Sequence, residues 1–463
     1  MNTTFSFSNI LSEFKYSIRL AIPLIASELT YAANGFVATV MIAHLGENQL
    51  AANALVWSIY ITVALFFIGI LSAVSIMIAQ SFGAKDKRSV SACFKQGLIM
   101  SIIFALPMML IMWASPIVLV WTGQDQAVIE CAKPFFHALI WSMLPLNIII
   151  VIEQFLLGIN KTRLVMMISI ISVPISILFY YAFLFGKFGL PKLGLAGVGY
   201  SILVTNGLMA LYLIGYIYFS NQFKIYKLFK KWWLVNRKIL LELIRIGTPL
   251  GFMYCIEVAL FAAIAIMMGT LGTTTLAAYQ IAYQYMMLAL MILFAMGQAA
   301  TVRVGNEVGK NNRGMIKLAS AVNIGIGMGF MLLFGVFYIG FPHWIIGLSV
   351  DIHAESLQSM ANQATTFLAI AGVLLLTECV RLISFGALRG LKDTKFPAIA
   401  SFIGFWCIAF PAAYLLAFKF KFGGTGIWWG MVIGLFVAGM MLLIRFNRLV
   451  KRIDLVALVT KSE

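Results

Sequence analysis

Apolar runs of about twenty residues recur from one end of the chain to the other, and they constrain the fold more than any other feature. A run of this length is what a helix needs to cross the hydrocarbon core of a bilayer. Only helices and closed barrels satisfy their backbone there, and the alternating pattern of a transmembrane barrel is absent. Hydrophobic residues make up 62% of the chain and charged residues 11%, whereas soluble domains carry about a quarter charged residues. The sequence therefore predicts an all-α, multi-pass integral membrane protein.

Turn and charge signals divide the apolar runs into twelve predicted transmembrane helices, spans 1 to 12. The first six lie near 16–43, 51–79, 95–121, 135–158, 164–186 and 195–219. The second six lie near 243–271, 275–303, 316–340, 364–388, 397–417 and 426–446. The connections are short, so no sizeable soluble domain is expected.

Connections rich in basic residues alternate along the chain with connections that hold few. Basic residues gather near both ends and in the connections after spans 2, 4, 6, 8 and 10. This bias predicts that both termini lie in the cytoplasm, and we expect the protein in the bacterial inner (plasma) membrane. The net charge of +17 is then explained by topology and by attraction to anionic membrane lipid. We therefore expect no nucleic-acid partner, and we expect a monomer.

A weak internal repeat relates the two sets of six spans. Pro23 matches Pro249, and Gly46 matches Gly272 at the same spacing. Each half holds an even number of spans, so both halves enter the membrane in the same orientation and form two pseudo-symmetric six-helix bundles, a parallel repeat. The predicted organisation is an N-terminal lobe 1–223, a cytoplasmic basic linker 224–242 and a C-terminal lobe 243–463. Such a plan is typical of secondary transporters.

Four acidic residues fall inside apolar spans: Glu28, Glu153, Glu257 and Glu378. An ionisable group at this depth costs about 3 kcal/mol or more and faces the protein interior or a wet cavity. Glu257 lies about 18 Å along its helix from the cytoplasmic charge that precedes it, and Glu378 is similarly deep. We interpret these two as cation-coupling residues for Na+ or H+, with an interior polar role as the alternative. Glu153 lies within two turns of the end of its span, where it can snorkel to the surface, and we expect no coupling role for it.

Arg381 follows Glu378 by three residues, so the two side chains share one face of a helix. One interpretation is a static ion pair that makes two buried charges tolerable. The other is a modulating ion pair, in which Arg381 competes with an incoming cation for Glu378. The sequence leaves both open.

Further polar and aromatic residues deep in the spans are candidates for a substrate cavity. They are Glu28, Tyr31, Asn34, Trp57, Tyr254, Gln280 and Gln284. Aromatic faces and carboxylates suit small organic cations through cation–π contact and charge attraction, while helix packing is the alternative for each. The five cysteines and four histidines lack the spacing of metal ligands. We therefore expect no cofactor and no metal besides Na+ at the coupling carboxylates.

Several motifs resemble one family, the multidrug and toxic compound extrusion transporters, and especially its NorM-like branch. The likeness covers essentially the whole chain. The most specific segments include Gly35–Met41 (GFVATVM), Gln80–Ala84 (QSFGA), Arg303–Asn306 (RVGN) and Ala387–Thr394 (ALRGLKDT). The resemblance implies two six-helix bundles and export of cationic drugs in exchange for inward Na+ or H+.

The resemblance also bears on the site. NorM-like members use an acidic residue in span 7 and another in span 10, and these positions correspond to Glu257 and Glu378. Relatives often have Asp in span 1 where this chain has Ala38, so a coupling site that needs that acid is in doubt unless Glu28 replaces it.

The predicted function is a cation-coupled antiporter that exports organic cations and drugs by alternating access. A lipid-linked oligosaccharide flippase of the same superfamily is the alternative. It would need a cationic cavity for pyrophosphate, whereas Arg381 is the only basic residue at depth. A membrane enzyme is disfavoured, because the short loops lack clusters of acidic residues or histidines.

Overall fold

The computed structural model describes residues 6–350, 354 and 357–460, and within them twelve helices are long and apolar enough to cross a membrane. This confirms the predicted all-α, twelve-span fold. The single-helix spans are α1 (Phe7–Ala43), α4 (Lys87–Trp121), α5 (Gln126–Gly158), α6 (Thr162–Phe185), α7 (Leu195–Phe219), α9 (Arg237–Thr270), α10 (Thr273–Gly309), α11 (Arg313–Gly340), α13 (Gln358–Gly390) and α16 (Gly423–Arg452).

Two spans are interrupted. The second consists of α2 (Glu47–Leu71) and α3 (Ala73–Gly83), which meet at Ser72. The eleventh alternates α-helix and π-helix in α14 (Lys395–Phe402), η2 (Ile403–Ala409), α15 (Phe410–Tyr414) and η3 (Leu415–Lys419). Two short helices, α8 (Asn221–Lys224) and α12 (Pro342–Gly347), lie in the connections, and a third, α17 (Leu455–Thr460), follows the last span.

Several helices begin two turns earlier than the apolar runs predict, because polar caps start them. Asp86 accepts hydrogen bonds from the backbone N–H groups of Arg88 and Ser89, which starts α4 at Lys87. Asp125 starts α5 in the same way. The apolar pattern records only the part of a helix inside the membrane, so it misses these polar first turns.

The chain forms two compact units, and each is described by itself. Unit 1 comprises the residues up to Ile25 together with Phe252–Leu458, and unit 2 comprises Ala26–Gly251 with the last residues of the chain. The boundaries fall inside α1 and α9, two residues after Pro23 and Pro249, and both helices continue through their proline. The lobe boundaries predicted from the repeat are another way to divide the chain, and they stay a prediction.

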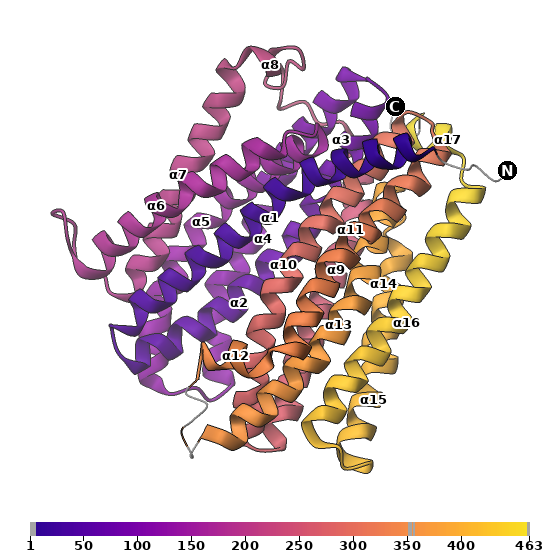
Figure 1. Cartoon of the computed structure of the whole chain (residues 1–463). Coiled ribbons are helices and arrows are strands. Elements are labelled where there is room, and N and C mark those ends of the chain that lie inside the picture. Colours follow the sequence, from indigo (N-terminus) through magenta and orange to yellow (C-terminus); the bar gives the residue numbers. More distant parts are fainter. Residues whose placement is uncertain (1–5, 351–353, 355–356, 461–463) are drawn as a thin grey trace. The chain divides into compact units, whose positions relative to one another are not determined.

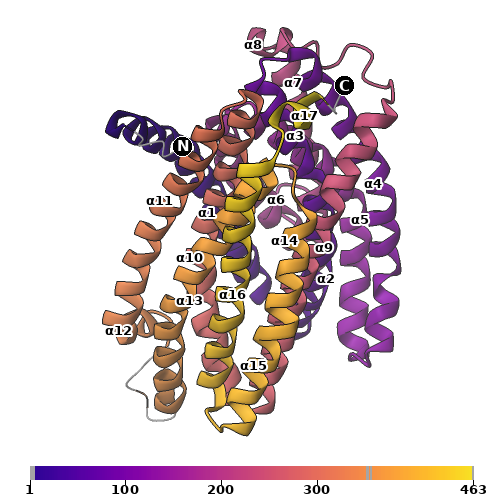
Figure 2. The ribbon, with the colours of Figure 1, turned by 90° about the vertical axis from the view of Figure 1, so that its right-hand side faces the viewer.

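Glycines allow close packing of the long helices of unit 1. There α10 and α13 run side by side, and α16 lies against α13 (Figures 1 and 2). A Cβ atom at Gly386 of α13 would overlap the carbonyl oxygen of Gly297 in α10. Small residues that let two backbones touch are typical of helix pairs in membranes.

This contact predicts that Gly386→Ala destabilises the protein by about 1–3 kcal/mol, because the added methyl group must push α10 and α13 apart. Gly329→Ala on α11 is the matched control: a Cβ there meets nothing within 4 Å, and alanine favours a helix over glycine. Thermal unfolding in detergent compares the two. Equal melting temperatures for both variants would contradict the packing argument.

The first part of α1 is held within unit 1 by a buried ionic cluster on α10, which we call the α1 anchor. Arg303 donates two hydrogen bonds to Glu13, Nε to Oε1 at 2.8 Å and Nη2 to Oε2 at 2.5 Å. Its Nη2 also lies 3.3 Å from Glu307, which pairs with Lys310 at 2.8 Å. The ring of Tyr16 stacks on the guanidinium, with 4.2 Å between Cζ and the ring centroid. Glu13 and Arg303 are both buried.

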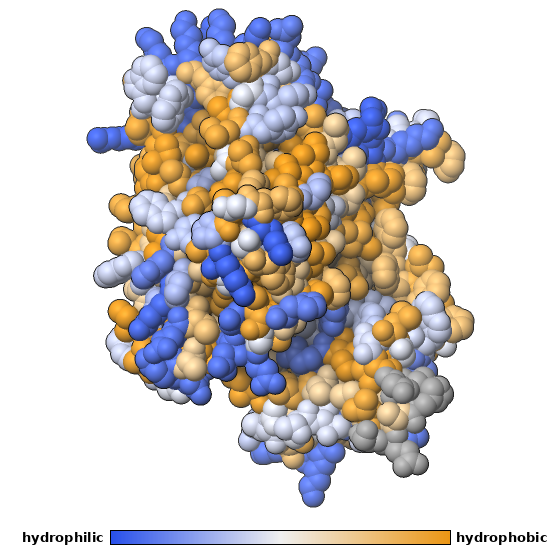
Figure 3. Space-filling model, turned by 90° about the vertical axis from the view of Figure 1, so that its left-hand side faces the viewer, coloured by the Kyte–Doolittle hydropathy of each residue, from blue (hydrophilic) through white to orange (hydrophobic). Residues whose placement is uncertain are grey.

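Unit 2 packs α5 against α2, α4 and α7. Gly199 of α7 faces Ala138 and Phe135 of α5, and the first part of α9 lies against α2 where Gly247 meets Ile70. Figure 3 shows one face of the molecule, with hydrophilic side chains gathered at its top, hydrophobic ones prominent directly below, and a mixture of both in the lower half. Leu211 and Trp113 of unit 2 are among the large apolar side chains that are exposed at the surface. Exposed apolar side chains of this size suit contact with lipid.

Candidate cation-coupling site

Three ionisable side chains meet in the interior of unit 1, and we call them the triad. Glu378 and Arg381 come from α13, and Glu257 comes from α9. Arg381 Nε donates to Glu378 Oε2 at 2.8 Å, and Nη2 lies 2.7 Å from the same oxygen. Arg381 Nη2 also donates to Glu257 Oε1 at 2.8 Å. One guanidinium thus bridges two carboxylates that are 121 residues apart in the sequence.

The triad is almost entirely removed from solvent. The side chains of Arg381, Glu378 and Glu257 are 0%, 1% and 9% exposed. Two carboxylates against one guanidinium leave one negative charge uncompensated when all three are ionised. Among the described residues, Glu257 Oε2 and Arg381 Nη1 are buried without a hydrogen-bond partner. Unpartnered polar atoms at this depth are costly, so the triad has both a residual charge and a free acceptor to offer a ligand.

Aromatic residues lie near the triad. The ring of Phe405 in η2 lies 5.0 Å from Arg381 Cζ. Trp406 donates to the carbonyl oxygen of Ile256, next to Glu257, at 3.4 Å. Tyr283 of α10 interacts electrostatically with Glu257. The π-helical turn of η2 brings Phe405 and Trp406 to this site, as π-helical segments often do at functional sites.

A second group of predicted residues comes together in unit 2. The hydroxyl of Tyr31 in α1 donates to Oε1 of Glu153 in α5 at 2.7 Å, and Glu28 interacts electrostatically with both. Asn34 lies one turn further along α1. Glu153 is therefore turned toward α1, and the expectation that it has no coupling role stays a prediction. The signal was present in the sequence as an ionisable residue inside a span, but the partner on another helix was not.

The remaining cavity candidates are Trp57, Tyr254, Gln280 and Gln284. Trp57 stacks on Tyr60 of α2 with 5.0 Å between ring centroids. Gln280 and Gln284 are exposed and one turn apart on α10 in unit 1, and Tyr254 of α9 is half-buried. Their assignment to a substrate cavity stays a prediction.

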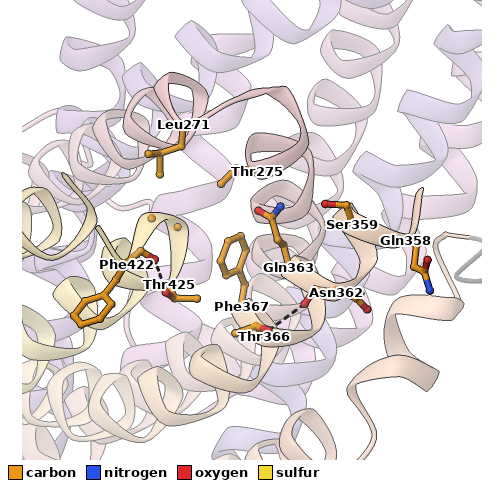
Figure 4. A pocket seen from close by; sticks show the side chains of 12 residues that line it. Leu271, Thr275, Gln358, Ser359, Asn362, Gln363, Thr366, Phe367, Phe422 and Thr425 are labelled. Carbon is orange, nitrogen blue, oxygen red and sulfur yellow. Dashed lines mark hydrogen bonds between the residues drawn. The ribbon is translucent and has the colours of Figure 1, made fainter. Parts of the chain in front are cut away.

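An uncharged cavity lies elsewhere in unit 1, at the start of α13. It has a volume of about 770 Å³, and Gln363 and Phe367 point toward Thr275 and the first turn of α16 (Figure 4). Its other walls are Leu271, Gln358, Ser359, Asn362, Thr366, Phe422, Gly423, Gly424 and Thr425. None of these residues carries a charge, so this cavity does not offer an ion the compensation that the triad does.

Twelve helices long and apolar enough to span a membrane, with ionisable groups held at depth, are typical of the class of secondary membrane transporters. The MatE family model matches residues 23–182 and 249–415. The chain therefore belongs to this family, the multidrug and toxic compound extrusion family that its motifs resemble.

Similar proteins match this chain over almost its full length. The chain is 31% identical over 443 residues to "Probable multidrug resistance protein NorM" of Rhizobium meliloti, covering 96% of this chain and 95% of that protein. It is 34% identical over 438 residues to the protein of the same name from Pseudomonas aeruginosa, covering 94% and 90%. An outward-facing multidrug resistance MATE transporter has the same fold, with a TM-score of 0.86 at 19% identity over 95% of this chain and 96% of that one. A eukaryotic MATE transporter matches with a TM-score of 0.84 at 22% identity over 98% and 99%.

Proposed function

We propose that this multidrug efflux transporter is a cation-coupled antiporter, which exports organic cations and drugs by alternating access in exchange for inward Na+ or H+. Multidrug efflux follows from the family and from the relatives named NorM. The coupling ion and the site that binds it are what we propose in addition to the family and the relatives. Cargo and ion are carried without chemical change, so we propose no enzymatic activity and no resident cofactor.

The triad is the observation that carries this proposal. Its residual negative charge and the free Glu257 oxygen suit one small monovalent cation. A bound Na+ or H+ would neutralise the triad. Neutralisation would weaken the attraction of the site for a cationic cargo and would lower the cost of moving the triad through the membrane field.

The energetics are sufficient for multidrug export. One charge that crosses a potential of about 100 mV yields about 2.3 kcal/mol, enough for a roughly fifty-fold gradient of a neutral cargo. A monovalent cationic cargo exchanged one for one moves no net charge, so it would depend on the ion gradient itself.

The flippase alternative is not favoured. A pyrophosphate group needs basic residues that are free to pair with it. Arg381, a deeply buried cation of unit 1, is already held by two carboxylates.

The twelve spans and the bacterial relatives support a multi-pass protein of the inner membrane. We further propose that both termini lie in the cytoplasm, since the basic connections gather on that side. Contact with anionic lipid and a monomeric state belong to the same proposal.

The proposal predicts that Glu257→Gln abolishes energised drug export. The variant would leave a neutral triad with no charge for the ion to compensate. Proteoliposomes loaded with ethidium test it under an imposed Na+ gradient and, separately, under an imposed pH gradient; wild-type protein then also reveals which ion is used. Glu47→Gln, at the exposed first turn of α2, is the control. Wild-type export rates in Glu257→Gln would refute the assignment.

A further inference from the structure

We propose that Glu153, Tyr31 and Glu28 form a binding site in unit 2 for the positive charge of the exported organic cation. We call these residues the acid pair with its tyrosine. This inference rests on the proposed function and deepens it, because it separates the residues that hold the cargo from those that hold the coupling ion.

Two carboxylates interact with one phenol. Glu28 and Tyr31 are three residues apart and share a face of α1, and the Tyr31 hydroxyl donates to Glu153 at 2.7 Å. Glu28 interacts electrostatically with Glu153 and with Tyr31. The two acids come from α1 and α5, so the site is assembled by tertiary packing within unit 2.

The charge balance at Glu153 differs from that of the triad. Glu153 takes part in no ion pair among the residues that the structure describes. The Tyr31 hydroxyl orients the carboxylate but is neutral, so it does not compensate the charge. A second carboxylate close by makes it more costly to keep both ionised, and a cation bound beside them would relieve that cost. In the triad, by contrast, Arg381 already supplies a cation.

The aromatic surroundings favour an organic cation over an inorganic one. Tyr31 is 45% exposed, so part of this residue is accessible to a ligand. One turn along α1, Asn34 lies beside the hydroxyl of Tyr180, which interacts with Tyr60. Tyr60 in turn carries the stacked Trp57, itself 41% exposed. Carboxylates with open aromatic faces nearby are the combination that binds lipophilic cations.

Binding of tetraphenylphosphonium to purified protein in lipid nanodiscs tests the site. This probe is a permanent organic cation, and triphenylphosphine oxide is its uncharged counterpart. We expect Glu153→Gln to weaken binding of the cation about tenfold or more and to leave binding of the neutral compound unchanged. Tyr31→Phe, which keeps the ring and removes the hydroxyl, should weaken cation binding about threefold. Glu153→Asp should restore part of the affinity.

Glu130→Gln is the matched control, because Glu130 lies on the same helix and is exposed at its other end. Cation affinity equal to wild type in Glu153→Gln would overturn the inference. Equal loss of the charged and the neutral probe would also overturn it, since the residue would then be structural. So would competition by Na+ that requires Glu153, because the ligand would then be the inorganic ion. Failure of the proposed function is distinct: wild-type protein would export no drug under either gradient.

Discussion

Arg381→Gln is expected to destabilise the protein by about 3–5 kcal/mol and to change the ion dependence of export. The substitution removes the only cation that Glu257 and Glu378 contact among the described residues. Two buried carboxylates would then lie close together with no guanidinium between them, so they would recruit additional Na+ or H+ instead. Export should fall about tenfold or more at a fixed gradient, since extra ions must be released in every cycle.

Two variants separate charge from geometry in this test. Arg381→Lys keeps the charge but cannot bridge both carboxylates with a planar fork, so it should retain ion dependence with reduced stability. Arg448→Gln removes an exposed cation from α16 and should behave as wild type. Initial export rates at varied Na+ concentration and pH, together with melting temperatures, distinguish a modulating role of Arg381 from a static one. Reduced stability with unchanged ion dependence would make Arg381 a static partner, and the modulating role would be lost.

The sequence predicts one half of the triad and cannot predict the other. Glu378 and Arg381 are three residues apart on one helix, so their contact follows from helix geometry alone. The depth of Glu257 could be estimated from its distance to the preceding charge. Its contact with Arg381 could not, because it depends on how α9 is rotated and shifted against α13. That register is set by side-chain packing along the helices, which a hydrophobic pattern does not encode.

The same limit explains Glu153. Its position near the end of an apolar run is compatible with a side chain that reaches the membrane surface. In the structure it turns to Tyr31, because the first helix of the chain passes close to α5. The twelve helices, by contrast, follow from apolar length, which is a property of each segment separately.

The α1 anchor shows a further effect of tertiary packing. Glu13 precedes the first predicted span and Arg303 ends the eighth. From the apolar pattern alone, both residues would be expected to be charges at the membrane surface. The structure buries them together because α1 begins at Phe7, well before its apolar part. Arg303 also opens the RVGN motif, which gives this motif a physical role: its arginine holds the start of α1 within unit 1.

Arg303→Gln should therefore be strongly destabilising, by about 3–5 kcal/mol. The substitution leaves the Glu13 carboxylate buried without its bidentate partner, while Lys310 still compensates Glu307. We expect a lower melting temperature and easier proteolysis of the chain before Pro23, because the first part of α1 would lose its charged contact with α10.

A double-mutant cycle measures the pair itself. Glu13→Gln should be less harmful than Arg303→Gln, because Glu307 still lies 3.3 Å from the guanidinium. The double variant, Glu13→Gln with Arg303→Gln, should recover part of the loss, since no unpaired charge then remains buried. Additive losses would show that the two residues act independently and that other contacts hold α1. A coupling energy of about 1–3 kcal/mol would instead show that this ion pair fixes the part of α1 before Pro23. Any movement of α1 during transport would then have to bend the helix near Pro23 or break the Glu13–Arg303 pair.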